Sequence, residues 1–488
     1  MERVLQGLKP ERVFYYFEEL CKIPHGSYNV QMISDYCLNL ARGMGMEARQ
    51  DEELNVVIRV PAFPGYEDAP AVMIQGHMDM VAVKDPDVEK DMLTEGLDLI
   101  VDGDYVRAKG TSLGGDDCIA VAMALAIMED RSLPHPELEL VFTTQEEVGM
   151  DGMHALDTSD LHARYLLNLD SEEEGHFLAG CAGGVRANAE FETRRVPVTG
   201  QQVQIAISGL AGGHSGTEID KCRANAIVLA GRVLFDLHEE VQLHLVSIEG
   251  GEKDNAIPLA CTMTLIIDPE DLPQLESRLS AIAADIAAEY RTSDPGLQIR
   301  IRVCDEAETD GSVLHPAAFE KLILLLMEMP NGIQTMSADL PGLVESSLNA
   351  GIIRTEEDVI RISWAIRSSV KSLKTLISSK LEYLTEFLGG EITFKGSYPE
   401  WTFNPQSPIC GLCCRLYEAQ TGRKAVISTM HAGVECGLLG EKMPSLDMVS
   451  MGPDLLDIHT TSEHMSIASV ERCYRLVLAV LEAIRGEI

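Results

Sequence analysis

Two adjacent carboxylates end the apolar run "VFTTQEEVGM", where Glu146 and Glu147 follow a strand-like stretch. Like charges at the end of a buried strand repel each other and resist burial. A bound cation offsets that cost, and a carboxylate beside it can take up and release a proton during a reaction. The pair therefore indicates metal binding combined with general base catalysis.

Further imidazole and carboxylate groups follow other apolar runs. "AVMIQGHMDM" ends with His77 and Asp79, the glycine-rich stretch "GTSLGGDDCIA" carries Asp116 and Asp117, and "YLLNLD" ends with Asp170. In open α/β sheets, ligands bind beyond the carboxyl ends of the strands. We therefore expect these side chains to meet at one edge of a sheet.

The last apolar run, "LDMVSM", is followed by a segment that carries His459 and His464. Imidazole and carboxylate without thiolate suit zinc, with manganese and cobalt as alternatives. About five ligands exceed the needs of one tetrahedral ion, so we expect two divalent ions about 3.5–4 Å apart that share a carboxylate. A single histidine or acidic pair at a strand end usually has only a structural role. The metal-site hypothesis therefore depends on several such residues occurring at strand ends in one chain.

Spacing predicts how the roles divide. Neighbouring residues of an extended segment point in opposite directions, so one of Glu146 and Glu147 is expected to bind metal and the other to act as the base. His77 and Asp79 are two residues apart and point the same way. We expect Asp79 to fix the tautomer of the imidazole, with a ligand role as the alternative.

The elements that must position these residues alternate along the first part of the chain. Helix-like segments at 11–24 and 31–44 precede the strand-like runs "NVVIRV", "AVMIQGHMDM", "LELVFTTQ" and "YLLNLD". Continuous apolar strands separated by helices are typical of a parallel sheet covered on both faces. We therefore predict an α/β fold with a mostly parallel sheet flanked by helices.

The middle of the chain has a different pattern. Strands of period two, such as "QVQIAISGL" and "VIRISWAIRSS", are separated by longer helices at 222–240 and 272–291. This pattern predicts an α+β domain with one sheet face covered. After it the α/β pattern resumes, so we predict that residues 186–398 are a lid domain inserted between catalytic-domain segments 1–185 and 399–488.

Composition limits the class of protein. A chain of 488 residues needs two or three domains, and its net charge of −38 argues against nucleic-acid and anionic-membrane partners. The N-terminus has no apolar signal core, and the longest apolar run, 118–128, is about half a bilayer span. The 12 cysteines lie mostly in apolar contexts, as buried thiols do in a reducing compartment. We expect a soluble cytoplasmic protein.

Several motifs together resemble a known family. "GHMDM", "GTSLGGDD", "TTQEEVGMDG", "NLDSEEEG", "GGHSG", "NAIP" and "HAGVECG" are spread over most of the chain, about 75–465. They resemble the co-catalytic zinc metallopeptidases, the family that includes carboxypeptidase G, peptidase T and the cytosolic dipeptidases. The similarity is greatest to its dipeptidases of the aminoacyl-histidine (Xaa-His) type.

The resemblance implies a role for each residue of the predicted metal site. His77 and Asp170 would share one ion, and Asp116 would bridge both, with Asp117 as a rival because Cys118 stands where many relatives carry lysine or glycine. Glu147 would bind the second ion, and Glu146 would be the general base. The histidine of the "HTTSE" pattern, His459, would complete the second set, with His464 as the less favoured choice.

The resemblance also implies residues that contact the substrate. His214 in "GGHSG" would stabilise the oxyanion, from its own chain or across a homodimer. Asn255 in "NAIP" and Arg367 in "WAIRSS" would hold the terminal carboxylate, for which an arginine fork is suited. Glu435 is a candidate for binding the free amine of the substrate, and His431 is left without a role.

These observations predict a metal-dependent hydrolase that cleaves dipeptides with a free N-terminus, of the Xaa-His type. One alternative is an amidase or deacylase that acts on N-acyl amino acids with the same scaffold. Another is a non-catalytic peptide-binding protein, although Glu146 and the expected ligands are all present. The expected partner is a small peptide substrate.

Overall fold

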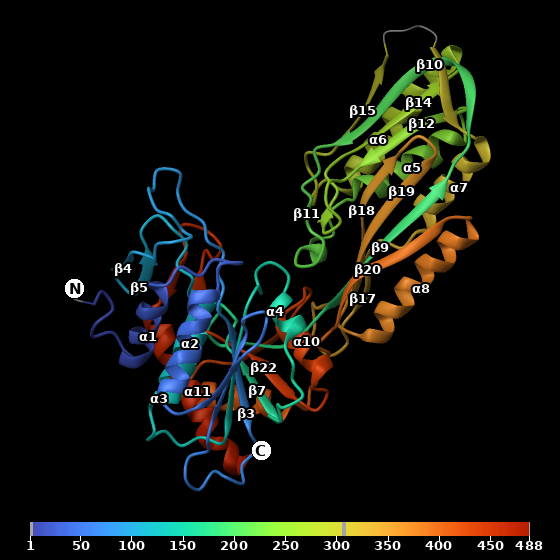
Figure 1. The fold of residues 1–488 in the computed structure, drawn as a ribbon. Helices are drawn as coiled ribbons and strands as arrows, with labels where there is room; N and C mark the ends of the chain where they lie inside the picture. Colours follow the sequence, from blue (N-terminus) through green and yellow to red (C-terminus); the bar gives the residue numbers. More distant parts are fainter. Residues whose placement is uncertain (1–2, 305–308, 488) are drawn as a thin grey trace. The chain divides into compact units, whose positions relative to one another are not determined.

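The computed structural model describes residues 3–304 and 309–487, and the chain divides into two compact units (Figure 1). The first comprises Met1–Gly180, Phe403–Thr429 and Val434–Ile488, and the second comprises Cys181–Thr402 and Met430–Gly433. The chain passes from the first unit to the second after Gly180 and returns at Phe403. These boundaries differ by a few residues from those predicted at 185/186 and 398/399. The return of residues 430–433 to the second unit was not predicted.

The first unit is built around an eight-stranded sheet with the order β1-β2-β6-β3-β7-β22-β8-β21. Its strands are β1 (Glu47–Gln50), β2 (Val56–Val60), β3 (Val72–His77), β6 (Leu138–Thr143), β7 (Tyr165–Asn168), β8 (His176–Cys181), β21 (Val426–Met430) and β22 (Asp447–Ser450). Strands β6, β3, β7 and β22 run parallel. Strands β1, β2 and β8 pair antiparallel with their neighbours. The sheet is therefore parallel at its centre and antiparallel toward its edges.

Helices cover both faces of this sheet. They are α1 (Glu11–Cys21), α2 (Gln31–Gly43), α3 (Gly115–Glu129), α4 (Asp151–Ala155), α9 (Pro408–Thr421), α10 (Glu435–Lys442) and α11 (Ile467–Glu487). Figure 1 shows α1, α2 and α3 on one side of the strands and α4 and α10 on the other. This two-sided cover explains why β3 and β6 are buried at every position. The α/β prediction for this unit is confirmed.

A small sheet brings two distant loops of the first unit together. It has the order β23-β24-β5-β4. Its strands are β4 (Leu99–Asp102), β5 (Tyr105–Ala108), β23 (Leu455–Leu456) and β24 (His464–Ser466). Strand β5 precedes the glycine-rich loop that enters α3, and β24 follows the loop that carries His459. Pairing of β24 with β5 therefore aligns these two loops.

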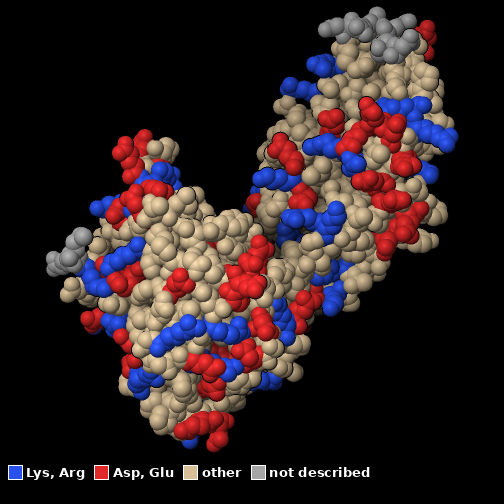
Figure 2. Space-filling model, in the orientation of Figure 1, with Lys and Arg blue, Asp and Glu red and all other residues tan. Residues whose placement is uncertain are grey.

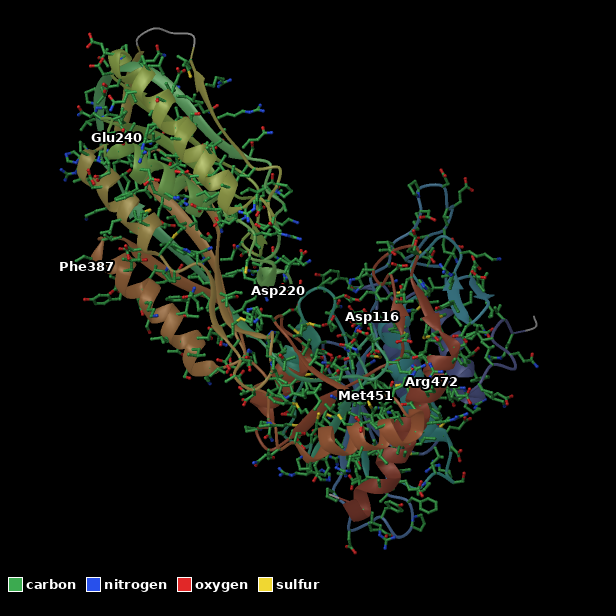
Figure 3. All side chains as sticks on the ribbon, turned by 180° about the vertical axis from the view of Figure 1, so that it is seen from behind. Asp116, Asp220, Glu240, Phe387, Met451 and Arg472 are labelled. Carbon is green, nitrogen blue, oxygen red and sulfur yellow. The ribbon has the colours of Figure 1, made fainter. Side chains whose placement is uncertain are left out.

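An ion pair ties the C-terminal helix to the same unit. Arg472 of α11, labelled in Figure 3, donates to Glu174 with 2.7 Å between Nε and Oε1. Glu174 lies in the loop between β7 and β8, and its backbone N–H donates to Asp454. Bidentate pairs of this kind fix geometry as well as adding stability.

The second unit is an antiparallel sheet of ten strands. They are β9 (Gly183–Glu192), β10 (Arg195–Ser208), β12 (His244–Gly250), β14 (Cys261–Ile267), β15 (Gln298–Val303), β16 (Thr309–Leu314), β17 (Gly332–Met336), β18 (Val344–Thr355), β19 (Val359–Ser368) and β20 (Glu391–Tyr398). A separate two-stranded sheet pairs β11 (Gly213–His214) with β13 (Ala256–Ile257). Short 3-10 turns lie at η1 (Ile219–Lys221) and η2 (Pro269–Asp271).

One face of the large sheet is covered by four helices. They are α5 (Ala226–His238), α6 (Leu272–Glu289), α7 (Pro316–Glu328) and α8 (Lys371–Phe387). Along β10, Val203, Ile205 and Ile207 are buried, whereas Gln204 and Ala206 between them are partly exposed. This alternation confirms the predicted α+β unit with one covered face.

Figure 2 shows acidic and basic side chains interleaved on the drawn face of each unit. Within the described part of the chain, every helix is too short or too polar to cross a bilayer. No disulfide joins cysteines in these residues.

Candidate metal centre

Five of the predicted residues lie together in two groups that share Asp116. The first group is His77, Asp116 and Asp170, and the second is Asp116, Glu147 and His459. In each group the potential ligand atoms all lie within 4.8 Å of one another. Asp116 is the only member of both groups in the described residues, which gives the arrangement the form of two adjoining cation sites.

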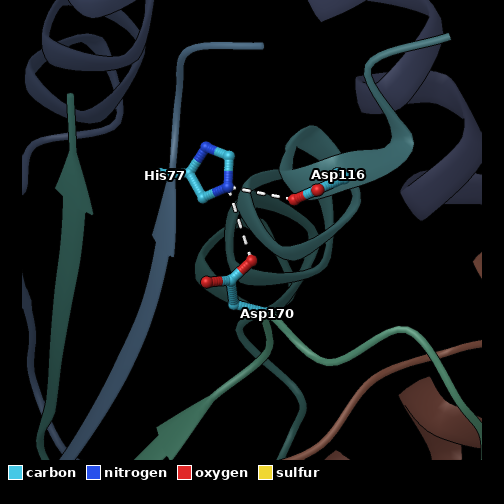
Figure 4. Close-up of side chains that lie close together, drawn as sticks. All are labelled: His77, Asp116 and Asp170. Atoms are coloured by element: carbon cyan, nitrogen blue, oxygen red, sulfur yellow. Dashed lines mark hydrogen bonds and ion pairs between the residues drawn. The ribbon is translucent and has the colours of Figure 1, made fainter. Parts of the chain in front are cut away.

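The first group forms where parallel strands end (Figure 4). His77 is the last residue of β3, and Asp170 follows the neighbouring strand β7. The imidazole Nε2 of His77 lies 3.0 Å from Asp116 Oδ1 and 3.4 Å from Asp170 Oδ1. Because β3 and β7 run in the same direction, their carboxyl ends present both side chains at one sheet edge.

The second group joins a turn and a loop. Glu147 lies in the turn that follows β6, and His459 lies between β23 and β24 with a left-handed backbone, φ 61°. His459 Nε2 is 3.0 Å from Glu147 Oε2 and 3.2 Å from Asp116 Oδ2. His464 instead lies in β24, where Nδ1 is 2.9 Å from the carbonyl oxygen of Ser462.

The position of Asp116, labelled in Figure 3, depends on a break at the start of α3. Asp116 and Asp117 have non-helical backbone angles, so their side chains leave the helix in different directions. Asp117 Oδ2 accepts a bond from the backbone N–H of His77 at 3.3 Å. Asp116 thus belongs to both groups, and Asp117 belongs to neither.

Asp79 fixes the ring of His77. His77 Nδ1 lies 2.9 Å from the carbonyl oxygen of Asp79 and 3.6 Å from its Oδ1. Nδ1 therefore carries a proton toward Asp79, which leaves Nε2 directed at Asp116 and Asp170. Asp79 is fully buried, and its other carboxylate oxygen accepts a bond from Ser27 Oγ at 2.8 Å.

The local structure predicted around Glu146 is wrong in one respect. Strand β6 ends at Thr143, and residues 146–149 form a turn rather than an extended segment. Gln145 adopts φ 57°, and its carbonyl oxygen accepts a bond from Met150 N at 2.7 Å. The turn nevertheless separates the two glutamates, because Glu147 faces His459 while the backbone N–H of Glu146 donates to Asp79 Oδ1 at 3.1 Å.

Electrostatics at the centre indicate a need for positive charge. Burial alone would lower the pKa of His77, but Asp170 and Asp116 raise that pKa well above its usual value. Hydrogen bonds to Asp116 and Glu147 raise the pKa of His459 to about 10. Burial raises the pKa of Asp170 to about 7 against the opposing charge of His77. Without a cation, protons must therefore occupy the space between imidazoles and carboxylates.

The donors present fit a pair of divalent cations. Glu147 Oε1 is buried and has no hydrogen-bond partner in the described residues. A buried carboxylate oxygen without a partner costs free energy, and a cation would satisfy it. The set contains imidazole nitrogen and carboxylate oxygen without sulfur, which suits zinc and also manganese or cobalt.

Glu435 lies beneath this centre in a buried polar network. Its Oε2 accepts bonds from Gln75 Nε2 at 2.5 Å and Thr143 Oγ1 at 2.8 Å, and Gln75 also accepts from Asn168. Burial raises the pKa of Glu435 to about 8, against the opposing charge of His77. The side chain is fully buried, whereas sequence reasoning expected it to face the substrate.

The predicted substrate residues Arg367 and His214 lie close together in the second unit. Arg367 of β19 is 8% exposed, and its Nη2 lies 3.5 Å from His214 Nε2. His214 Nδ1 accepts a backbone bond from Thr217 at 3.1 Å, which leaves Nε2 to carry the proton. Asn255 directly precedes β13, whose Ala256 pairs with His214.

Three further polar residues of the second unit surround Arg367. Ser347 is its cross-strand partner on β18, and Ser347 Oγ lies 2.7 Å from His431 Nε2. Tyr398 Oη accepts a bond from Arg367 Nη1 at 2.8 Å. Burial and the charge of Arg367 lower the pKa of His431 to about 4. Sequence reasoning missed Ser347 and Tyr398, since strand pairing alone brings them to the arginine.

A protein-family model, "Peptidase family M20/M25/M40", matches residues 73–483. The chain belongs to this family. It is therefore a peptidase and a hydrolase, as predicted.

The peptidase is also similar to individual relatives over its whole length. It is 34% identical over 482 residues to the cytosol non-specific dipeptidase of Escherichia coli, covering 98% of this chain and 99% of the relative. Among solved structures it matches the aminoacylhistidine dipeptidase of Vibrio alginolyticus with a TM-score of 0.93, 34% identity and 98% coverage of both chains. The aminopeptidase PepT of Bacillus cereus shares the fold, with a TM-score of 0.57, 15% identity, and coverage of 98% of this chain and 99% of that one.

Proposed function

We propose that the peptidase hydrolyses dipeptides with a free N-terminus, with a preference for C-terminal histidine, through a centre of two divalent cations. The observation that carries the proposal is the Asp116 carboxylate, which directs one oxygen to His77 and the other to His459. Support for a dipeptide substrate comes from the names of the Escherichia coli and Vibrio relatives.

The roles of the cation-binding residues follow from the two groups. His77 and Asp170 would hold one cation, Glu147 and His459 would hold the other, and Asp116, which belongs to both groups, would serve both. Zinc is the metal that this donor set favours, with manganese and cobalt as alternatives. When bound, such a pair polarises a carbonyl group and lowers the pKa of water.

Glu146 acts as the general base. It neighbours the ligand Glu147, and its backbone is fixed by Asp79. Burial raises the pKa of Glu146 well above its usual value, the charge of His77 opposes this, and the charges of Asp170 and Glu435 reinforce it. The carboxylate takes a proton from the attacking water and then delivers it to the leaving amine.

The resemblance of their motifs assigns recognition of the peptide to Arg367, Asn255 and His214. Arg367 and Asn255 bind its terminal carboxylate, and His214 donates Nε2–H to the developing oxyanion. Burial and the charge of Arg367 lower the pKa of His214, so the ring is a neutral donor. We place the enzyme in the cytoplasm, because its Escherichia coli relative is named as cytosolic.

A substrate panel tests this function. The purified, metal-loaded protein is assayed with free dipeptides that end in histidine, with matched dipeptides that end in other residues, and with their N-acetylated forms. We expect cleavage of the free dipeptides, fastest for Xaa-His, and none of the acetylated forms. Hydrolysis of N-acyl amino acids in place of dipeptides would identify a deacylase, and stoichiometric metal without turnover would identify a binding protein.

A further inference from the structure

A buried carboxylate holds the loop that delivers Asp116. Glu463 Oε2 accepts backbone N–H bonds from Leu113 at 2.7 Å and Gly114 at 3.2 Å, and Oε1 accepts one from Gly115 at 2.8 Å. The side chain of Glu463 is 3% exposed, and no ion pair to it occurs among the described residues. Three backbone donors thus replace a cationic partner, as in anion-binding backbone nests.

The backbone of this loop has little space for side chains at Gly114 and Gly115. Gly114 has a left-handed backbone with φ +65°, and a Cβ there would come within 2.9 Å of Met80 and 3.0 Å of His25. A Cβ on Gly115 would lie 3.3 Å from Glu463 Oε1. The glycines therefore allow the backbone to approach the carboxylate closely, and Asp116 follows directly.

The same glutamate lies four residues after His459. Its backbone N–H donates to the carbonyl oxygen of Thr460 at 3.3 Å. The short segment that carries His459 therefore also carries the carboxylate that holds the Asp116 loop. The two ends of this connection meet where His459 Nε2 lies 3.2 Å from Asp116 Oδ2. A single side chain therefore links the positions of two residues that come from distant parts of the chain.

We propose that Glu463 is a positioning residue of the metal centre, which sets Asp116 against His459 and so defines the second cation position. This inference rests on the proposed function, because it assumes that the centre holds two cations. Glu463 does not touch the cation or the substrate, and it acts through the three backbone N–H groups of residues 113–115.

The charge and both oxygens of Glu463 are needed for this role. In a Glu463→Gln variant one acceptor oxygen becomes an NH2 group, which faces a backbone N–H without an acceptor between them. The loop then shifts or leaves that donor unsatisfied. Loss of a partner that orients a ligand typically reduces metal affinity about 10–100-fold. We expect the larger loss at the Glu147–His459 position, because both Asp116 and His459 depend on Glu463 there, and a smaller loss at the His77–Asp170 position, which shares only Asp116.

Cobalt titration of the metal-free, full-length protein tests the proposal. Wild type, Glu463→Gln and Glu463→Asp are titrated with Co²⁺, and bound metal and the visible absorption of the cobalt centre are recorded. Asp457→Asn is the matched control, because it removes the same charge from an exposed position of the same loop, and asparagine tolerates its left-handed backbone of φ 53°. We also measure kcat and KM with a dipeptide.

The expected result is that wild type and Asp457→Asn bind two Co²⁺ ions tightly. Glu463→Gln should bind the second about 10–100-fold more weakly, with an altered spectrum and a lower kcat but little change in KM. Glu463→Asp keeps the charge, and its affinity for the second Co²⁺ ion should lie between those of wild type and Glu463→Gln. Binding of both ions by Glu463→Gln with wild-type affinity would overturn the inference, as would equal weakening of both ions in both variants. A wild type that binds no cation would overturn the proposed function itself.

Discussion

The carboxylate of Asp79 accepts a hydrogen bond from the backbone N–H of Glu146 at 3.1 Å. The second oxygen of this carboxylate accepts a bond from Ser27 Oγ at 2.8 Å. The backbone carbonyl oxygen of Asp79 lies 2.9 Å from His77 Nδ1. One fully buried residue thus connects His77, a proposed ligand of one cation, to Glu146, the proposed base. A displacement of Asp79 would therefore affect metal binding and proton transfer together.

Removal of the Asp79 side chain should impair both properties, because it takes away the carboxylate oxygen that lies 3.6 Å from His77 Nδ1 and that accepts the Glu146 N–H bond. The bond between His77 Nδ1 and the backbone carbonyl oxygen of Asp79 remains. We expect Asp79→Ala to lower metal affinity or kcat about 10–100-fold, the effect typical of groups that orient a metal ligand. Asp79→Asn, which can still accept from Glu146, should retain more activity. Metal content and steady-state kinetics measure the effect, and the exposed Asp87→Asn in the following loop is the control. Wild-type values in Asp79→Ala would exclude the connecting role.

Glu146→Gln should separate catalysis from metal binding. An amide cannot take a proton from water, so we expect kcat to fall about 100- to 10,000-fold while two metal ions remain bound. Metal analysis of the purified variant beside its kinetics is the measurement, and Glu173→Gln at an exposed position is the control. If metal content falls with activity, Glu146 is the ligand and Glu147 is the base.

Arg367→Ala should act mainly on KM. Hydrogen bonds to charged groups contribute about 1.5–3 kcal/mol, which corresponds to a rise in KM of about 10–100-fold for a dipeptide. Arg361 lies on the same strand, is exposed, and pairs with Glu190 at 2.9 Å, so Arg361→Ala is a matched control. An unchanged KM in Arg367→Ala would remove this residue from the carboxylate site.

The metal-free protein should lose stability as pH rises. Burial raises the pKa of Asp170 to about 7 and that of Glu435 to about 8, whereas unfolded carboxyl groups titrate near about 4. A pKa that is higher in the folded state favours folding below the unfolded pKa, and this contribution is lost as pH rises through the folded pKa. We expect Tm to fall between about pH 5 and 8.5.

Thermal unfolding of the metal-free and metal-loaded protein across this range measures the effect. Bound cations balance the ionised carboxylates, so the loaded protein should show a smaller fall in Tm. A metal-free Tm that rises toward pH 8.5 would show that burial does not raise the pKa values of these carboxyl groups.

Much of the centre could be predicted from where apolar runs end. His77 and Asp170 follow neighbouring parallel strands, and the carboxyl ends of such strands meet at one edge. The positions of the apolar runs also predicted that Asp116 or Asp117 and His459 or His464 would join this edge, and the resemblance to known motifs favoured Asp116 and His459. The antiparallel edge strands and the turn at Glu146 were not predicted, because hairpin pairing and turn geometry depend on tertiary packing.

Residues that act through long-range contacts were the hardest to predict. Glu463 was part of the pattern that identified His459, but its bonds to residues 113–115 depend on the pairing of β24 with β5. The apolar neighbours of Glu435 gave no sign that Gln75 and Thr143 would enclose it. Such contacts join residues hundreds of positions apart, and no local period of the sequence records them.

The central claim is that Asp116 lies between two cations, and anomalous X-ray diffraction tests it most directly. Crystals of the protein loaded with zinc are measured on both sides of the zinc absorption edge. We predict two anomalous peaks per chain, about 3.5–4 Å apart, one beside His77 and Asp170 and the other beside Glu147 and His459, with Asp116 between them. A single peak, or peaks remote from Asp116, would contradict the account.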